Sequence, residues 1–151
     1  MQLMDGIKVS GRFWFCVYNS KGELKEERVI NNAMTTTGLA SVAALICADK
    51  AFTGYDYIGI GTGVTAVASA NTALESEVGR MATTGTVVTT TSALDTAQFV
   101  GQTTFGASFA ITEAGVLNAS SSGNLLCRQT FSAINVVSGD SLQVTYKVKA
   151  A

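Results

Sequence analysis

The chain has 151 residues, of which 47% are hydrophobic and 14% are charged, and its 10 basic and 11 acidic residues give a formal net charge of −1. This length supports one domain with a real core, so we expect residues 1–151 to form a single domain. The high hydrophobicity excludes a disordered charged tail, and the balanced charge argues against sequence-independent nucleic-acid binding.

The chain contains no histidine and three widely spaced cysteines. Histidine is the commonest general base, the base of serine triads and a usual zinc ligand. Without it, and without a CxxC pair, we expect neither an enzyme nor a metal or cofactor site. The cysteines Cys16, Cys47 and Cys127 all lie in apolar stretches, so we predict buried structural thiols in a protein made in a reducing cytoplasm. The N-terminus has no signal-peptide pattern, and we expect no membrane span.

The first elements along the chain form a predicted β-hairpin. Residues 12–18 are rich in aromatic and other strand-favouring residues, and residues 19–22 read Asn-Ser-Lys-Gly. Residues 24–30 contain four charged residues in a row, followed by two apolar ones. This pattern is typical of two strands joined by a turn. We expect the second strand to be largely exposed, with its charges protecting a sheet edge from unwanted pairing.

A single helix is predicted over residues 36–48, capped by Thr35 or Thr36. Its apolar residues Leu39, Val42, Ala43 and Ile46 recur at helical spacing, so we expect this stripe to face the core.

Strands and loops alternate in the rest of the chain. Strands are expected over residues 55–60, 80–91, 98–105, 108–112, 125–131 and 142–148, with one or two helical turns over residues 72–78 and a turn over residues 119–124. In the last strand the apolar residues alternate with polar ones, which indicates one buried face. The fold class is therefore predicted as mainly β, a β-sandwich or jelly roll of about seven or eight antiparallel strands with one helix.

Two motifs could indicate a binding or catalytic site, and each has a simpler structural interpretation. Residues 61–66 match the GxGxxA form of the dinucleotide fingerprint, but neither a crossover helix nor the acidic ribose ligand follows, so we interpret them as a tight turn. The acids Glu75, Glu77 and Glu113 lack the setting of a glycosidase pair. We expect Glu75 or Glu113 to form an internal ion pair with Arg80 or Arg128.

Several short motifs occur together in a fixed order, and their combination carries a family resemblance. They read TGLA (37–40), YIGIGTG (57–63), TALESEV (72–78), ITEAGVLN (111–118), LCRQTFS (126–132) and GDSLQVTY (139–146). From about residue 10 onward, the chain resembles small virion structural proteins of tailed bacteriophages, and within these it is most similar to jelly-roll capsid cement (decoration) proteins.

The resemblance implies a non-enzymatic protein on the capsid exterior that clamps neighbouring capsomers as a dimer or trimer. Its expected partners are the major capsid protein and copies of itself, without nucleic acid, membrane, cofactor or small-molecule substrate. A neck or tail-fibre protein is the alternative, and a carbohydrate-binding sandwich is a less favoured one.

Aromatic and arginine side chains are favoured at interaction hot spots. The predicted contact surface therefore consists of Phe13, Trp14, Phe15, Tyr18, Glu26, Glu27 and Arg28. For the aromatic residues, a place in the core is an equally good interpretation.

Overall fold

The computed structural model describes residues 6, 8–49 and 51–150. Along these residues ten strands and one helix follow each other in the order β1 (Val9–Tyr18), β2 (Leu24–Asn31), β3 (Ala33–Met34), α1 (Thr36–Ile46), β4 (Tyr57–Gly61), β5 (Glu77–Ala82), β6 (Thr84–Val88), β7 (Thr96–Thr104), β8 (Phe109–Leu117), β9 (Leu125–Val136) and β10 (Ser141–Ala150).

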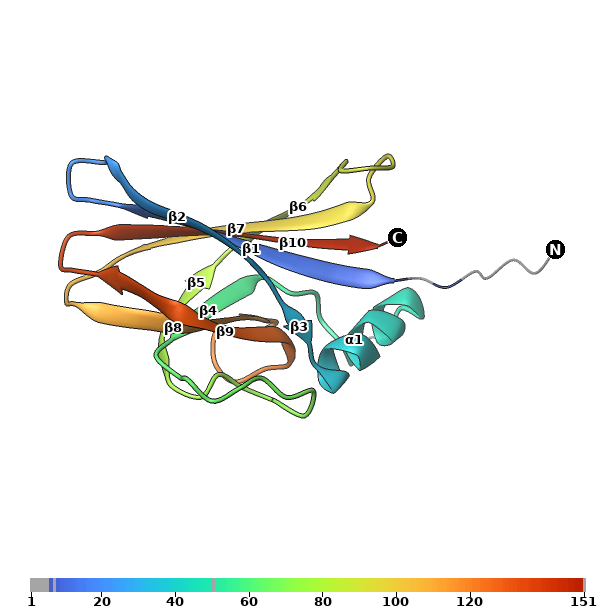
Figure 1. Ribbon diagram of the computed structural model, residues 1–151. Coiled ribbons are helices and arrows are strands. Elements are labelled where there is room, and N and C mark those ends of the chain that lie inside the picture. The colour runs from blue at the N-terminus through green and yellow to red at the C-terminus, as the bar shows by residue number, and fades with distance from the viewer. Residues whose placement is uncertain (1–5, 7, 50, 151) are drawn as a thin grey trace.

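The strands form two five-stranded antiparallel sheets that pack face to face (Figure 1). The first sheet has the order β2-β1-β10-β7-β6, and the second has the order β3-β9-β8-β4-β5. This confirms the predicted mainly β sandwich with one helix. The strands number ten instead of about eight, because β3 was not predicted and residues 80–91 form parts of two strands.

The chain changes sheets at Thr83, so the single strand predicted over residues 80–91 is wrong. β5 belongs to the second sheet and β6 to the first, and between them the Thr83 N–H donates a hydrogen bond to the Asp56 carbonyl at 2.8 Å. The helical turns predicted over residues 72–78 are also wrong, since residues 72–76 form a loop and residues 77–78 begin β5. Residues 119–124 form the predicted turn, in which the Asn118 side chain accepts a hydrogen bond from the Asn124 N–H at 2.7 Å.

The predicted hairpin is confirmed as β1 and β2. The Asn19 side-chain oxygen accepts hydrogen bonds from the N–H groups of Lys21 and Glu23, and Gly22 adopts φ +81°, a conformation that glycine tolerates best. β2 lies at the edge of the first sheet, and its residues alternate between exposed and half-buried.

The helix is present, but of its predicted apolar stripe only Val42, which is half-buried, packs against the core, and the prediction is wrong for the other three residues. Leu39 is 53% and Ile46 is 72% exposed, whereas Gly38 and Ser41 are buried. A β-carbon on Gly38 would lie 2.1 Å from the Leu126 carbonyl oxygen. α1 therefore packs so closely on β9 that only small residues fit on the contacting side. Thr35 is the N-cap, as one of the two predicted alternatives, and its hydroxyl accepts a hydrogen bond from the Gly38 N–H at 2.9 Å.

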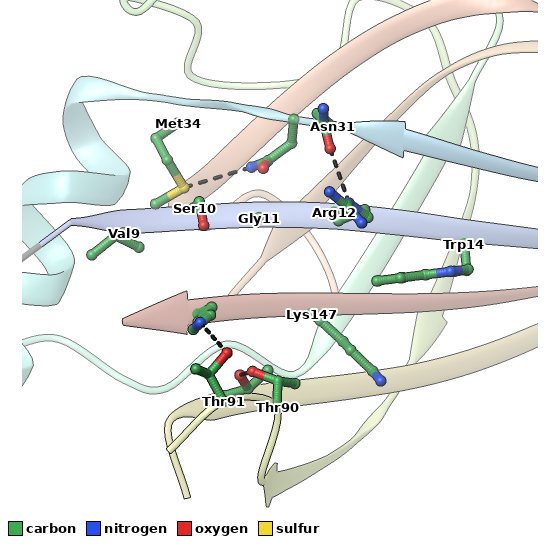
Figure 2. Close-up of a pocket in the computed structure, with 13 residues that line it drawn as sticks. Val9, Ser10, Gly11, Arg12, Trp14, Asn31, Met34, Thr90, Thr91 and Lys147 are labelled. Carbon is green, nitrogen blue, oxygen red and sulfur yellow. Dashed lines mark hydrogen bonds between the residues drawn. The ribbon is translucent and has the colours of Figure 1, made fainter. Parts of the chain in front are cut away.

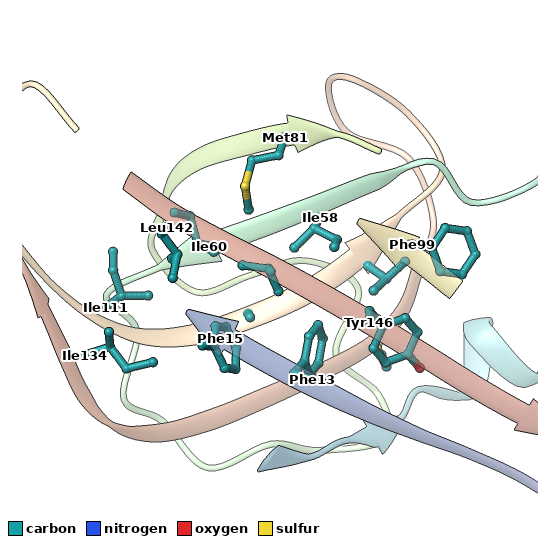
Figure 3. Close-up of a cluster of buried hydrophobic side chains, with 14 of the residues drawn as sticks. Phe13, Phe15, Ile58, Ile60, Met81, Phe99, Ile111, Ile134, Leu142 and Tyr146 are labelled. Carbon is teal, nitrogen blue, oxygen red and sulfur yellow. The ribbon is translucent and has the colours of Figure 1, made fainter. Parts of the chain in front are cut away.

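The core lies between the two sheets (Figure 3) and is rich in aromatic side chains. The rings of Phe13 and Tyr146 lie 4.7 Å apart, and those of Phe15 and Phe131 lie 4.9 Å apart. In β10, Leu142, Val144 and Tyr146 are fully buried and alternate with more exposed polar residues, as the period of two predicted.

Candidate functional site

The predicted contact residues of the hairpin lie on different sides of the first sheet. Phe13 and Phe15 are buried at 0% and 1% exposure and belong to the core. The core interpretation is therefore the right one for these two residues, which offer no surface to a partner. Trp14 is half-buried and, because neighbouring residues of a strand alternate between faces, it lies on the outer face of the sheet. Tyr18, at the end of β1, is also half-buried.

The three charged contact residues of β2 are divided in the same way. Arg28 donates hydrogen bonds to the Ser132 carbonyl and hydroxyl oxygens on β9, and Glu26 forms an ion pair with Arg28. Arg28 therefore links β2, at the edge of the first sheet, to β9 of the second sheet, and Glu26 compensates its charge. Glu27 is exposed and pairs in register with Cys16, which places it on the outer face with Trp14.

Trp14 lies at one side of a pocket of about 640 Å³, which runs from the outer face of the first sheet around the start of β1 to Met34 on the second sheet (Figure 2). Two cations lie over its indole ring: the Arg12 guanidinium is 5.7 Å and the Lys147 ammonium 5.3 Å from the ring centroid. Arg12 also donates from Nε to the Asn31 side-chain oxygen at 3.0 Å, which fixes the guanidinium at the β2 side of the pocket. Attraction to the ring face favours each of these cations at this position.

The opposite side of the pocket is built by the loop between β6 and β7. The Asp95 carboxylate accepts hydrogen bonds from the N–H groups of Thr90, Thr91 and Ser92, and it lies 3.9 Å from the Lys149 ammonium. These backbone donors, that of Ser92 above all, outweigh the opposing effect of desolvation and hold the pKa of Asp95 well below its usual range. The loop therefore keeps the hydroxyl of Thr91 beside Lys149, from which it accepts a hydrogen bond (Figure 2).

The pocket lining combines positive charge with hydroxyl and amide groups. Its polar side chains are Ser10, Arg12, Asn31, Asn32, Thr90, Thr91, Thr96, Lys147 and Lys149, and no carboxylate is among the lining residues. Such a site attracts an anion that also carries hydrogen-bonding groups.

The sequence pointed to Trp14 but not to the other side of this pocket. Lys147 and Lys149 lie on β10, where the alternating pattern predicts an outward face, but their proximity to Arg12 depends on the pairing of β1 with β10. Thr90 and Thr91 belong to a segment predicted as a strand. No local sequence pattern predicts that β1, β10 and the loop between β6 and β7 lie side by side.

Of the carboxylates considered for chemistry, only Glu113 lies in a buried structural centre, with the exposed Glu75 at its border. Glu113 is fully buried and accepts hydrogen bonds from the N–H groups of Gly63, Glu75 and Ser76 at 3.1, 3.0 and 2.7 Å. The Arg128 Nε donates to the same carboxylate at 2.8 Å, and Arg128 also reaches Glu75 at 3.3 Å. This confirms the predicted internal ion pairing of Glu75 and Glu113 with Arg128, whereas Arg80 pairs with Glu77.

The electrostatics of this centre favour an ionised Glu113. Burial raises the pKa of the carboxyl group, but the N–H groups of Ser76 and Glu75 and the Arg128 guanidinium outweigh it, so the pKa lies below its usual value. A β-carbon on Gly63 would lie 2.5 Å from Glu113 Oε1, so the glycine motif provides space for this carboxylate. Residues 61–66 thus end β4, run into an irregular loop and line an ion pair, so the tight turn predicted here is wrong.

The three cysteines have different surroundings. Cys127 is buried, and burial raises the pKa of its thiol to about 11, so it is protonated at neutral pH. Cys16 is half-buried and Cys47 is exposed. The prediction of buried thiols is thus right for Cys127 and wrong for Cys47, which follows the solvent-exposed end of α1.

Among residues 6, 8–49 and 51–150, no group of three or more acidic or cysteine side chains is placed to hold a metal ion. In the same part of the chain, no helix has the length and hydropathy needed to cross a bilayer.

Comparisons of the chain with protein-family models, curated proteins and solved structures found no match.

Proposed function

We propose that the chain is a non-enzymatic structural protein of a tailed-bacteriophage virion, and specifically a cement protein that binds the outside of the icosahedral head and stabilises contacts between capsomers. The ordered sequence motifs are the basis for the family. The feature that supports a binding role is the β1–β2 hairpin, which in the described part of the chain has an unpaired sheet edge and outward-facing aromatic and apolar side chains.

The apolar part of this surface lies at the sheet edge. Trp14 on β1 pairs in register with Val29 on β2, which is 47% exposed, and Tyr18 pairs with Leu24, which is 52% exposed. Within the described residues, β1 is the only strand that pairs with β2. A partner strand added here would gain main-chain hydrogen bonds as well as these side-chain contacts.

The arrangement suits a protein that acts in many symmetric copies. Main-chain pairing at an edge needs no extended sequence motif, and an aromatic anchor beside charged residues is typical of an interaction hot spot. Contacts that are weak singly suffice when many copies bind one capsid lattice, because simultaneous engagement multiplies their effect.

The location is tested by labelling intact virions with an antibody against this chain and imaging them by electron microscopy. Label over the head facets supports the cement role. Label at one vertex or along the tail supports the alternative, a neck or tail structural protein. Unlabelled virions contradict both.

The contact surface is tested separately with Trp14→Ala. We expect this variant to melt like the wild type, because Trp14 lies on the outer face, but to lose binding to virions stripped of the native protein. Tyr57→Ala is a matched control, since Tyr57 is a half-buried aromatic residue on the second sheet. Equal binding by wild type and Trp14→Ala would remove the hairpin from the proposed contact surface.

A further inference from the structure

We propose that the pocket beside Trp14 binds an acidic sugar residue, that is, a pyranose ring that carries a carboxylate. The juxtaposition behind this proposal is an indole ring and three cations around one hydroxyl-rich hollow of about 640 Å³ (Figure 2). That volume lies within the range of small-molecule sites, about 300–1,000 Å³. The site shares Trp14 and Asn31, the last residue of β2, with the hairpin of the proposed capsid contact, whereas Lys147, Lys149 and the loop between β6 and β7 lie outside it.

Charge is the first argument for an anionic ligand. Arg12, Lys147 and Lys149 converge on the pocket, although the whole chain has a formal charge of −1. Within the described residues, neither Arg12 nor Lys147 forms an ion pair, and only Lys149 lies near a carboxylate, that of Asp95. A bound carboxylate would relieve the repulsion between these neighbouring cations and form charge-assisted hydrogen bonds with them.

The lining groups are the second argument, and they favour a sugar over a simple ion. The Ser10 hydroxyl, the Asn31 amide nitrogen and the O–H of Thr91, whose oxygen accepts from Lys149, can still bind the ring hydroxyls of a saccharide. The Thr90 hydroxyl is bonded to Asp95 and Thr96 and only shapes the wall. The indole of Trp14, over which Arg12 and Lys147 lie, adds apolar ring atoms to the same wall, and the C–H groups of a saccharide can contact these atoms while the cations hold its carboxylate. Inorganic phosphate would use the cations but not this surface.

The shape of the charge distribution argues against a nucleic acid. A phosphate backbone binds along a track of many cations, whereas this pocket has three cations in one place. The edge of the pocket toward β2 carries Asn31 instead of a further base. One carboxylate with its surrounding hydroxyl groups therefore fits the site better than a polyphosphate chain.

The proposal can be tested by fluorescence titration, because Trp14 is the single tryptophan of the chain. The probes are trigalacturonate, a hyaluronan tetrasaccharide and 3′-sialyllactose, with neutral maltotriose, inorganic phosphate and a ten-residue oligothymidylate for comparison. We expect a saturable change with at least one acidic saccharide, and a much smaller response to maltotriose and phosphate at equal concentration.

Variants locate the binding in the pocket. Lys147→Gln and Arg12→Gln should each weaken the acidic saccharide about tenfold, since each removes one charge-assisted contact. Lys21→Gln, in the exposed turn of the hairpin, removes the same charge elsewhere and should leave the affinity unchanged. Thermal melting of all three variants shows whether they fold.

Four results would overturn the proposal. These are no response to any of the acidic saccharides, an equal response to maltotriose or phosphate, tighter binding of oligothymidylate than of every acidic saccharide, and wild-type affinity in folded Lys147→Gln and Arg12→Gln. None of these results bears on the virion location, which the antibody labelling tests independently.

Discussion

Glu113 is the residue on which the long loop between β4 and β5 depends. Its carboxylate binds backbone N–H groups at both ends of this loop, Gly63 near the start and Ser76 near the end, and it compensates the charge of buried Arg128. We expect Glu113→Ala to lower the free energy of unfolding by about 3–5 kcal/mol, because it leaves a buried guanidinium without its main counter-charge. Urea denaturation measures this difference.

The matched control is Glu27→Ala on the exposed side of β2, which removes the same charge. It should change the free energy of unfolding by less than about 0.5 kcal/mol. A Glu113→Ala variant as stable as Glu27→Ala would show that the loop is held by other contacts.

The same carboxylate makes stability depend on pH. The pKa of Glu113 is lowered in the folded state, so its contribution to stability is fully present above the pKa of the unfolded chain, about 4.3. That contribution is lost as the pH falls through the lower folded pKa. The Asp140 carboxyl also contributes stability that is lost as the pH falls, since the Lys25 ammonium and the Val137 N–H lower its pKa.

We therefore expect the free energy of unfolding to fall between pH 5 and pH 3, and to fall less in Glu113→Gln than in the wild type. Urea denaturation at a series of pH values measures both slopes. Parallel slopes in the two proteins would mean that Glu113 titrates alike in the folded and unfolded states.

At the scale of elements, the contact between α1 and β9 depends on the absence of a side chain. Alanine normally stabilises a helix by about 1 kcal/mol relative to glycine. At Gly38 we expect the reverse, because the added β-carbon would meet the Leu126 carbonyl and force α1 away from the sheet. Gly38→Ala should lower the free energy of unfolding by about 1–3 kcal/mol, the usual cost of overpacking.

Gly106→Ala is the control for this substitution, since nothing lies within 4 Å of a β-carbon there. Its stability should equal or slightly exceed that of the wild type, because alanine restricts the unfolded chain. The melting temperatures of the two variants test this prediction. If Gly38→Ala melts at the same temperature as Gly106→Ala, α1 can shift away from the sheet without loss of stability.

Elements whose shape is set by near neighbours could be predicted from the sequence. Turn chemistry around Asn19 and Gly22 identified the first hairpin, and strict alternation identified β10 and its buried face. The loop over residues 72–76 could not be predicted, because Glu113, far along the chain, binds its N–H groups and replaces the hydrogen bonds of a helix.

The same distinction explains the helix face and the pocket. Periodicity located α1 correctly but not its orientation, which is set by how closely Gly38 approaches Leu126. Trp14 was recognised as a candidate contact, whereas the approach of Lys147 to it depends on strands at opposite ends of the chain that pair side by side.

At the scale of the whole molecule, the first sheet has two edges of different character. β2 carries exposed Leu24 and Val29 close to Trp14 and Tyr18, while the other edge strand, β6, carries exposed Val87. Edge strands invite pairing with another chain, and charged side chains, lysine among them, are one means by which proteins limit it. The charges over residues 25–28 restrict pairing at β2 to a fitting partner, whereas β6 carries no charged residue. The proposed cement role assigns the binding function to the β2 edge.

We therefore expect Val29→Lys to reduce the occupancy of the protein on virions stripped of the native copies, without changing its melting temperature, because Val29 is exposed in the free chain. Val87→Lys makes the same change at the opposite edge and should bind like the wild type. Quantitative gel analysis of sedimented particles measures both. If Val87→Lys instead abolishes binding and Val29→Lys does not, the contact surface lies at β6, and the hairpin has no part in attachment.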